Sequence, residues 1–204
     1  MSANNKASTD WLNAFLALGY QQGDSWEPCG GGVLLIDQPL VWLVTARQVV
    51  DTLGDQHMTA WVPSDQGAGL LDITDSQRQT DVSWVHHPIG LSATLFPIDP
   101  SFVVKACAEK QCTKVRDLQP LQPTATVGCL YGPDVAPTPF PKPAVCDGIV
   151  SSADSSSGHI YSTAQLLPNN TGAPLLLASP YGGAVTLAGI LLGNVMLTEN
   201  DPRV

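Results

Sequence analysis

Residues 30–50 read GGGVLLIDQPLVWLVTARQVV, and this stretch decides the predicted fold. Its two apolar runs, 32–36 and 41–45, are each long enough for a strand. Asp37-Gln38-Pro39 lies between them and is typical of a turn. Residues 46–53 then predict one short helical turn. The stretch therefore predicts two adjacent strands that lead directly into a short helix.

Short apolar runs of the same kind continue along the chain. In the first half, strands are predicted at 58–62, 70–74, 80–86 and 93–98. A polar connector follows, and the second half predicts strands at 124–131, 145–151, 159–163, 174–177 and 185–192. Two sets of about six short strands without alternating helices predict an all-β chain built as two barrels or a sandwich.

Composition limits the function classes. The chain has 204 residues, of which 44% are hydrophobic and 13% charged, so it is globular and not disordered. The net charge of −9 argues against a nucleic-acid or anionic-lipid partner, because either needs a basic face. No apolar run reaches the 18 residues of a membrane span, so none is predicted.

The first 24 residues are predicted to be a helical segment. Ser8-Thr9-Asp10 precedes Trp11, Leu12, Phe15 and Leu16, a pattern typical of a capped short helix. One lysine and an apolar run broken by Asn13 make a poor signal peptide. We therefore expect either a cytoplasmic protein or one whose signal or anchor has been removed.

Three segments, in this order, resemble the trypsin-like serine peptidases. The first is residues 30–50. In that family a Gly-rich strand leads to a Thr-Ala-x-His turn, and the histidine begins a short helix. The corresponding residues here are Thr45, Ala46, Arg47 and Gln48, so the resemblance places Gln48 at the position of the catalytic histidine.

The second segment begins at His87-Pro88 and continues through Ala93. The family has a His-Pro, a short gap and then Asp-x-Ala-x-Leu. Depending on the alignment, Leu91 or Ser92 stands at the aspartate position. Neither residue is a carboxylate.

The third segment is 167–176, LPNNTGAPLL, followed by 187–191, LAGIL. It is similar to the family's Gly-x-Ser-Gly-Gly-Pro loop and the strand after it. The resemblance places Thr171 at the nucleophilic serine and Asn169 at a glycine of the oxyanion hole. Gly172 and Pro174 are retained. The corresponding loop consists of Asn169, Asn170, Thr171 and Gly172.

The resemblance implies two six-stranded antiparallel β-barrels with the site in the cleft between them, plus the short N-terminal helix. The implied division is 1–24 for the helical segment, 25–100 for the first barrel, 101–123 for the connector, 124–195 for the second barrel and 196–204 for a C-terminal tail. It also favours an extracytoplasmic location.

The residues present predict that catalysis is lost. Acyl transfer in this family needs a nucleophile, a base and a group that orients the base. The amide of Gln48 has no proton-accepting pKa near neutrality. The extra methyl of Thr171 crowds the path of attack, and a threonine nucleophile still needs a base. We therefore expect an inactive pseudoprotease.

The expected function is protein or peptide binding or scaffolding, with no cofactor. The binding cleft of such a protein would be lined by Gln48, Asn169, Thr171 and the loop at 180–183. Backbone pairing with a strand edge would supply the affinity.

Two alternatives stay open. The first is metal binding by surface histidines. His86 and His87 are adjacent and point to opposite faces of a strand, so a site would combine one of them with His159, His57 or Asp81. The second is an unusual hydrolase that uses Thr171 or Cys29.

The five cysteines leave the redox state open. No Cys-x-x-Cys pair is present, so a zinc knuckle is not expected. Two disulfides are conceivable, Cys107–Cys112 and Cys129–Cys146, which would leave Cys29 as a thiol. The alternative is five reduced thiols.

Overall fold

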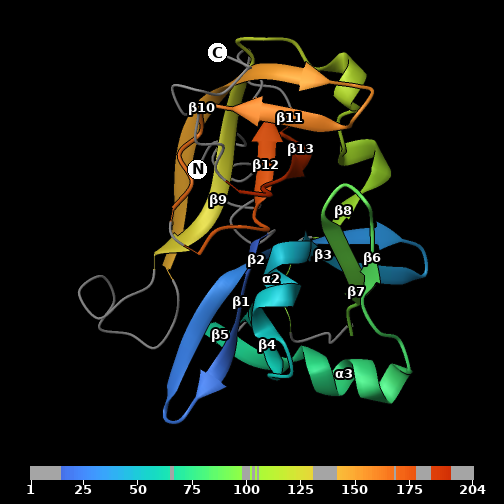
Figure 1. The fold of residues 1–204 in the computed structure, drawn as a ribbon, viewed down its shortest axis with the longest axis vertical. Helices are drawn as coiled ribbons and strands as arrows, with labels where there is room; N and C mark the ends of the chain where they lie inside the picture. Colours follow the sequence, from blue (N-terminus) through green and yellow to red (C-terminus); the bar gives the residue numbers. More distant parts are fainter. Residues whose placement is uncertain are drawn as a thin grey trace.

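The computed structural model describes residues 15–64, 67–97, 102, 104, 106–130, 142–167, 169–177 and 185–193. These residues form mostly β-structure in two sheets, one of eight strands and one of five, and one sheet is a half-barrel. In Figure 1 the five-stranded sheet lies above the eight-stranded sheet, with helix α2 (Arg47–Leu53) near the boundary between them.

The first sheet is built around a long central strand, β2, which is paired on both sides. The strand order is β5 (Gly67–Asp72), β4 (Met58–Ser64), β1 (Phe15–Gln22), β2 (Ser25–Asp37), β3 (Leu40–Ala46), β7 (Leu91–Leu95) and β6 (Val85–His86). A short additional strand, β8 (Ala106–Ala108), pairs with β2 in parallel. All other pairs in this sheet are antiparallel.

The hairpin predicted from residues 30–50 is confirmed. Strands β2 and β3 pair in the register Val33↔Val44 and Leu35↔Trp42. Helix α2 follows β3 without a loop and buries Val49 and Leu53. The local pattern was sufficient here because both strands and the helix are adjacent in sequence.

The second sheet is antiparallel throughout. Its strand order is β11 (His159–Ser162), β10 (Lys142–Asp154), β9 (Pro123–Leu130), β12 (Pro174–Leu177) and β13 (Thr186–Ile190). The segment before β9 holds two short 3₁₀ turns, η2 (Glu109–Gln111) and η3 (Val115–Asp117). An isolated parallel bridge between Cys112 and Leu187 ties this segment to β13.

The two sheets share one apolar core. A single buried cluster takes residues from both, namely Phe15, Ala17, Trp26, Val33, Val44, Cys107, Val127, Cys129, Ala173, Leu176 and Leu187. A second cluster lies within the first sheet and includes Val49 and Leu53 of α2. Because the shared cluster is continuous, the sheets hold each other in place through burial of apolar surface.

Two predicted elements are wrong. The helix expected over the first 24 residues cannot include Phe15–Gln22, which is strand β1; residues 1–14 lie outside the described residues. Strand β1 pairs with both β2 and β4, and these long-range partners override the local helical pattern. The strand expected at 80–86 is reduced to β6, and the preceding Ile73–Thr80 is helix α3.

Helix α3 has an identifiable start. The carboxylate of Asp72 accepts a hydrogen bond from the backbone N–H of Asp75 at 2.8 Å, which caps the helix. Only Ile73 of its eight residues is buried. The predicted strand at 70–74 therefore ends at Asp72, where the cap begins the helix.

The all-β prediction is confirmed in its coarse form, two largely antiparallel sheets. The described strands number eight and five, and the first sheet takes in β1 and β8, which lie outside residues 25–100. Within the described part of the chain, no helix has the length and hydropathy needed to cross a bilayer.

Truncating a buried and an exposed leucine should lower the free energy of unfolding by unequal amounts. Leu18 is fully buried in β1, whereas Leu70 is 45% exposed in β5. Leu18→Ala should lower the free energy of unfolding by about 3 kcal/mol because it leaves a cavity. Leu70→Ala should change it by no more than about 0.5 kcal/mol. Urea unfolding of the two variants checks this, and equal losses would contradict the assigned core.

Candidate functional site

The three segments that resemble the peptidase motifs converge on Thr45, near the end of β3. Thr45 is fully buried, and its hydroxyl donates a hydrogen bond of 2.6 Å to the carbonyl of Gly31 on β2. Its cross-strand partner on β7 is Ser92. The loop before β12 reaches the same place through Gly172, whose Cα lies against Thr45 and Gly31. Residues from three distant parts of the chain therefore lie next to Thr45.

Gly172 fits this place because it has no side chain. A Cβ added there would lie 2.1 Å from the carbonyl oxygen of Gly31 and 2.3 Å from the hydroxyl of Thr45. Its φ of 89° also lies in the region that favours glycine. The backbone N–H of Gly31 donates to the carbonyl of Thr171 at 2.7 Å, so the loop is fastened to β2 next to this contact.

Asn170 anchors the same loop to the second sheet. Its side chain is buried, and its Oδ1 accepts a hydrogen bond from the backbone N–H of Cys129 at 3.1 Å. A Cβ at Gly128 would lie 1.9 Å from the Asn170 amide nitrogen, so that glycine makes room for the asparagine. The sequence placed Asn170 in the loop but did not reveal that it packs against Gly128, two residues before the end of β9.

Asn169 and Thr171 lie toward the solvent side of this anchor. Asn169 is exposed and has φ of 61°, a left-handed conformation that asparagine tolerates better than most residues. Thr171 is half-buried. Among the described residues, no side chain hydrogen-bonds to the Thr171 hydroxyl, so no described base stands ready to take its proton.

Gln48 is on α2 and lines an open hollow along one side of that helix. The hollow measures about 400 Å³ and is lined by Ala46, Arg47, Gln48, Asp51, Thr52, Gly90 and Leu192. The backbone N–H of Arg47 donates to the carbonyl of Gly90 at 2.7 Å, which fixes the start of α2 against the turn before β7. The hollow contains one basic and one acidic side chain, and these form an ion pair of 3.4 Å.

Ser92 has a partner that the sequence did not predict. Leu91 pairs with Ala46 and Ser92 with Thr45, so both candidates for the aspartate position lie on the strand next to the start of α2. The Ser92 hydroxyl lies 2.8 Å from Nδ1 of His86 on β6. Ser92 is only 1% exposed, so its hydroxyl is shielded from solvent.

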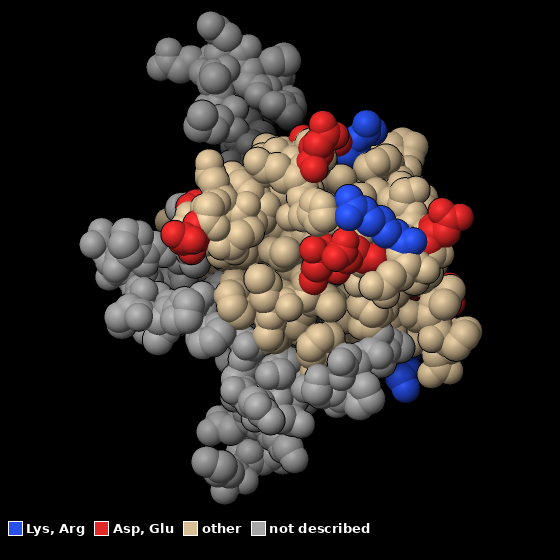
Figure 2. Space-filling model, turned by 90° about the horizontal axis from the view of Figure 1, so that it is seen from below, with Lys and Arg blue, Asp and Glu red and all other residues tan. Residues whose placement is uncertain are grey.

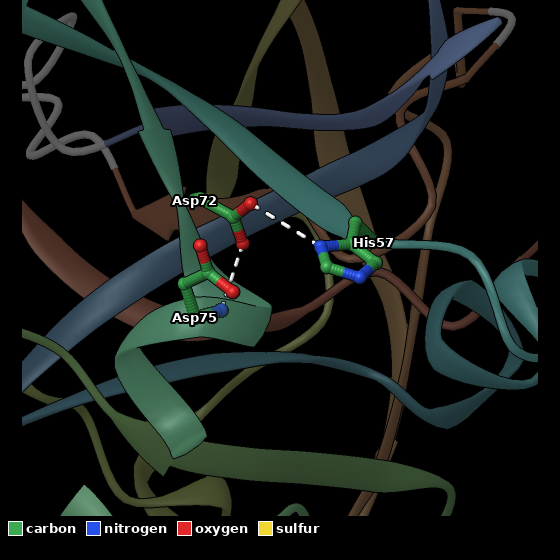
Figure 3. A group of neighbouring side chains, drawn as sticks. All are labelled: His57, Asp72 and Asp75. Atoms are coloured by element: carbon green, nitrogen blue, oxygen red, sulfur yellow. Dashed lines mark hydrogen bonds and ion pairs between the residues drawn. The ribbon is translucent and has the colours of Figure 1, made fainter. Parts of the chain in front are cut away.

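The histidines proposed for a metal site are not brought together. In the part of the chain that the structure describes, neither His86, His87 nor His159 belongs to any group of three close metal-type ligands. The described group of that kind consists of His57, Asp72 and Asp75, shown in Figure 3. Asp81 lies outside it, at the left-handed C-cap of α3 with φ of 55°.

The five cysteines, all of them described, are not joined by disulfides. Cys129 faces Pro143 in the sheet register and Cys146 faces Thr126, so the two cysteines of the conceivable Cys129–Cys146 disulfide are not opposite each other. Burial raises the pKa of the Cys29 thiol to about 12 and that of Cys129 to about 11. Both are therefore neutral thiols at physiological pH.

The predicted lining residues at 180–183 lie outside the described residues. The geometry thus gathers Thr45, Gly172 and Thr171 at one buried junction and places Gln48 in the adjoining hollow. Comparison with protein-family models gave no match, and no curated protein matched the chain.

The junction predicts a strong dependence on Gly172. Gly172→Ala should lower the free energy of unfolding by about 2–4 kcal/mol, because the added Cβ overlaps Gly31 and Thr45. Gly158 is the matched control: its φ is 76°, but a Cβ there would meet nothing within 4 Å. Gly158→Ala should cost only the backbone strain, about 1 kcal/mol. Equal losses in chemical unfolding would contradict the packing at Gly172.

Burial of Cys29 predicts a loss of stability at alkaline pH. The unfolded thiol ionises near its ordinary pKa of 9.0, whereas the folded thiol stays protonated until about 12. Above pH 9 the unfolded state therefore binds fewer protons, and the free energy of unfolding falls as pH rises toward 12. Cys29→Ala should make that decline shallower than in the native chain. Denaturant unfolding at a series of pH values measures this decline, with Cys146→Ala as the control. If the free energy of unfolding falls equally steeply with pH in Cys29→Ala and in the native chain, the burial of the Cys29 thiol is contradicted.

Proposed function

We propose that this chain is a non-catalytic relative of the trypsin-like peptidases, with two barrel-like halves, that binds an extended peptide in the hollow beside α2. The observation that carries the proposal is the position of Gln48. It lies in an open hollow next to the junction of Thr45, Gly31 and Gly172, where the resemblance would place a catalytic base.

The described groups support binding over cleavage. Gln48 supplies no base, and Leu91 and Ser92 supply no carboxylate to orient one. The hydroxyl of Thr171 has no described side-chain partner, and its carbonyl is already bound to Gly31. Replacing one triad member already costs several orders of magnitude in rate. All three positions differ here, so we expect no measurable peptidase activity.

The hollow suits a peptide backbone. The amide of Gln48 both donates and accepts hydrogen bonds, as a peptide group does. Gly90 brings no side chain into the hollow, and Leu192 offers an apolar wall. Because Arg47 and Asp51 neutralise each other there, the local charge does not demand a charged ligand.

The charges on the face seen in Figure 2 disfavour neither an acidic nor a basic partner. Acidic and basic side chains lie beside one another on that face, and no broad field of one sign is seen. The net charge of −9 still disfavours nucleic acid as the partner, since phosphate contacts need a basic surface. A protein or peptide ligand agrees with both observations.

The thiol of Cys29 gives little support to a hydrolase. Burial raises its pKa to about 12, so the nucleophilic thiolate is scarce at neutral pH. Cys29 also lies beside Gly30, whose Cα faces Val49 and the Thr171 carbonyl, and not in the hollow.

Filling the hollow should weaken peptide binding. Thr52 lines it and is exposed on α2, so Thr52→Trp should weaken binding of fluorescein-labelled, unfolded casein fragments at least about tenfold by steric exclusion. Fluorescence anisotropy measures this, and no fragment should be cut by the native chain.

Thr80→Trp is a matched control. Thr80 is also exposed and helical, and like Thr52 its hydroxyl donates to the carbonyl four residues earlier, but it lies on α3 outside the hollow. It should bind the fragments as the native chain does. The proposal fails if Thr52→Trp binds as tightly as Thr80→Trp, or if the native chain binds no fragment.

A further inference from the structure

One group of metal-type ligands shares no residue with the hollow and lies on the α3 side of the first sheet. It joins His57, just before β4, Asp72 at the end of β5, and Asp75 in the first turn of α3. One ligand atom from each residue lies within 4.8 Å of the other two. Figure 3 shows the His57 ring facing the Asp72 carboxylate, with Asp75 beside it on the helix.

Strand pairing and hydrogen bonds from backbone N–H groups hold these three residues in position. Thr59 and Asp72 are paired across β4 and β5, which brings His57 opposite the start of α3. The backbone N–H of Met58 donates to the Thr74 hydroxyl at 2.8 Å, a second tie between the same segments. The Asp72 carboxylate is oriented by its capping bond from Asp75. Two strands and a helix therefore fix the group.

The guanidinium of Arg78 already contacts two residues of this group. Arg78 lies 3.1 Å from Oδ1 of Asp75 and 3.2 Å from Nε2 of His57. A guanidinium can only donate, so Nε2 accepts and Nδ1 carries the ring proton toward Oδ2 of Asp72, 3.4 Å away. The Arg78 side chain is 63% exposed, and contacts of exposed ion pairs are weak. The group thus attracts a positive charge and holds one that is easily displaced.

We propose that His57, Asp72 and Asp75 bind a divalent transition-metal ion of the zinc class. One imidazole nitrogen with carboxylate oxygens is a ligand set that Zn²⁺ accepts, whereas Mg²⁺ and Ca²⁺ prefer oxygen alone. The ion takes Nδ1 of His57 and one oxygen from each aspartate, and water completes its coordination.

Binding moves one proton on the ring and none overall. Nδ1 gives up its proton to solvent as the metal bond forms, and Nε2 takes one from solvent. Because Nε2 then donates, it no longer accepts from Arg78, and the guanidinium turns away. Arg78 therefore competes with the metal.

This competition gives the proposal a distinctive test. Isothermal titration with ZnCl₂ compares the native chain with His57→Asn, Asp75→Asn and Arg78→Gln. Asp72 is left unchanged because it caps α3. His159→Asn is the control, since His159 is exposed and belongs to no such group among the described residues. Circular dichroism verifies that each variant is folded.

We expect one Zn²⁺ per native chain, with a rise in Tm on binding because the ion joins β4, β5 and α3. His57→Asn and Asp75→Asn should each weaken binding by more than about tenfold. His159→Asn should bind as the native chain does, and Arg78→Gln should bind more tightly. The proposal is overturned if the native chain binds no Zn²⁺, if His57→Asn and Asp75→Asn leave the affinity unchanged, or if Arg78→Gln weakens it.

Discussion

The buried hydrogen bond from Thr45 to the Gly31 carbonyl is the contact on which the rest of this structure depends. It joins β2 to the end of β3, opposite Ser92 of β7, and leaves just enough room for Gly172. A buried hydroxyl without a partner costs free energy. Strands β2 and β3 are therefore held in the positions that allow this bond to form. The loop that carries Thr171 is then held by the second sheet through Asn170. The two sheets and the three motif segments therefore meet at one point.

Much of the local structure could be predicted from the sequence because it involves neighbours. Strands β2 and β3 are two strand-length apolar runs joined by a turn, and the short helix α2 follows directly. The pairing of β1 with β4 and the parallel contact of β8 with β2 could not be predicted, since their partners lie far away in the chain. Helix α3 was missed because one capping carboxylate, and not an apolar stripe, determines its start.

The candidate site divides in the same way. The resemblance singled out Gln48, Thr171 and Gly172. Gly172 lies against Thr45, and Thr171 is bonded to the neighbouring Gly31, whereas Gln48 lines the hollow beside them. The anchoring role of Asn170 and the contact of His86 with Ser92 join residues that no local pattern connects. His57 is likewise separated from Asp72 by a whole hairpin, so only the pairing of β4 with β5 brings them together. The burial of the junction and the exposure of Gln48 on α2 are the observations on which the proposed peptide-binding function rests.

The most direct test of this account is labelling with a fluorophosphonate probe, which reacts only with an activated hydroxyl nucleophile. The native chain is compared with a triple variant that carries Gln48→His, Thr171→Ser and either Leu91→Asp or Ser92→Asp. The account predicts no labelling of the native chain and labelling of one triple variant at position 171, because the three segments already converge. Labelling of the native chain, or silence from both folded triple variants, would contradict it.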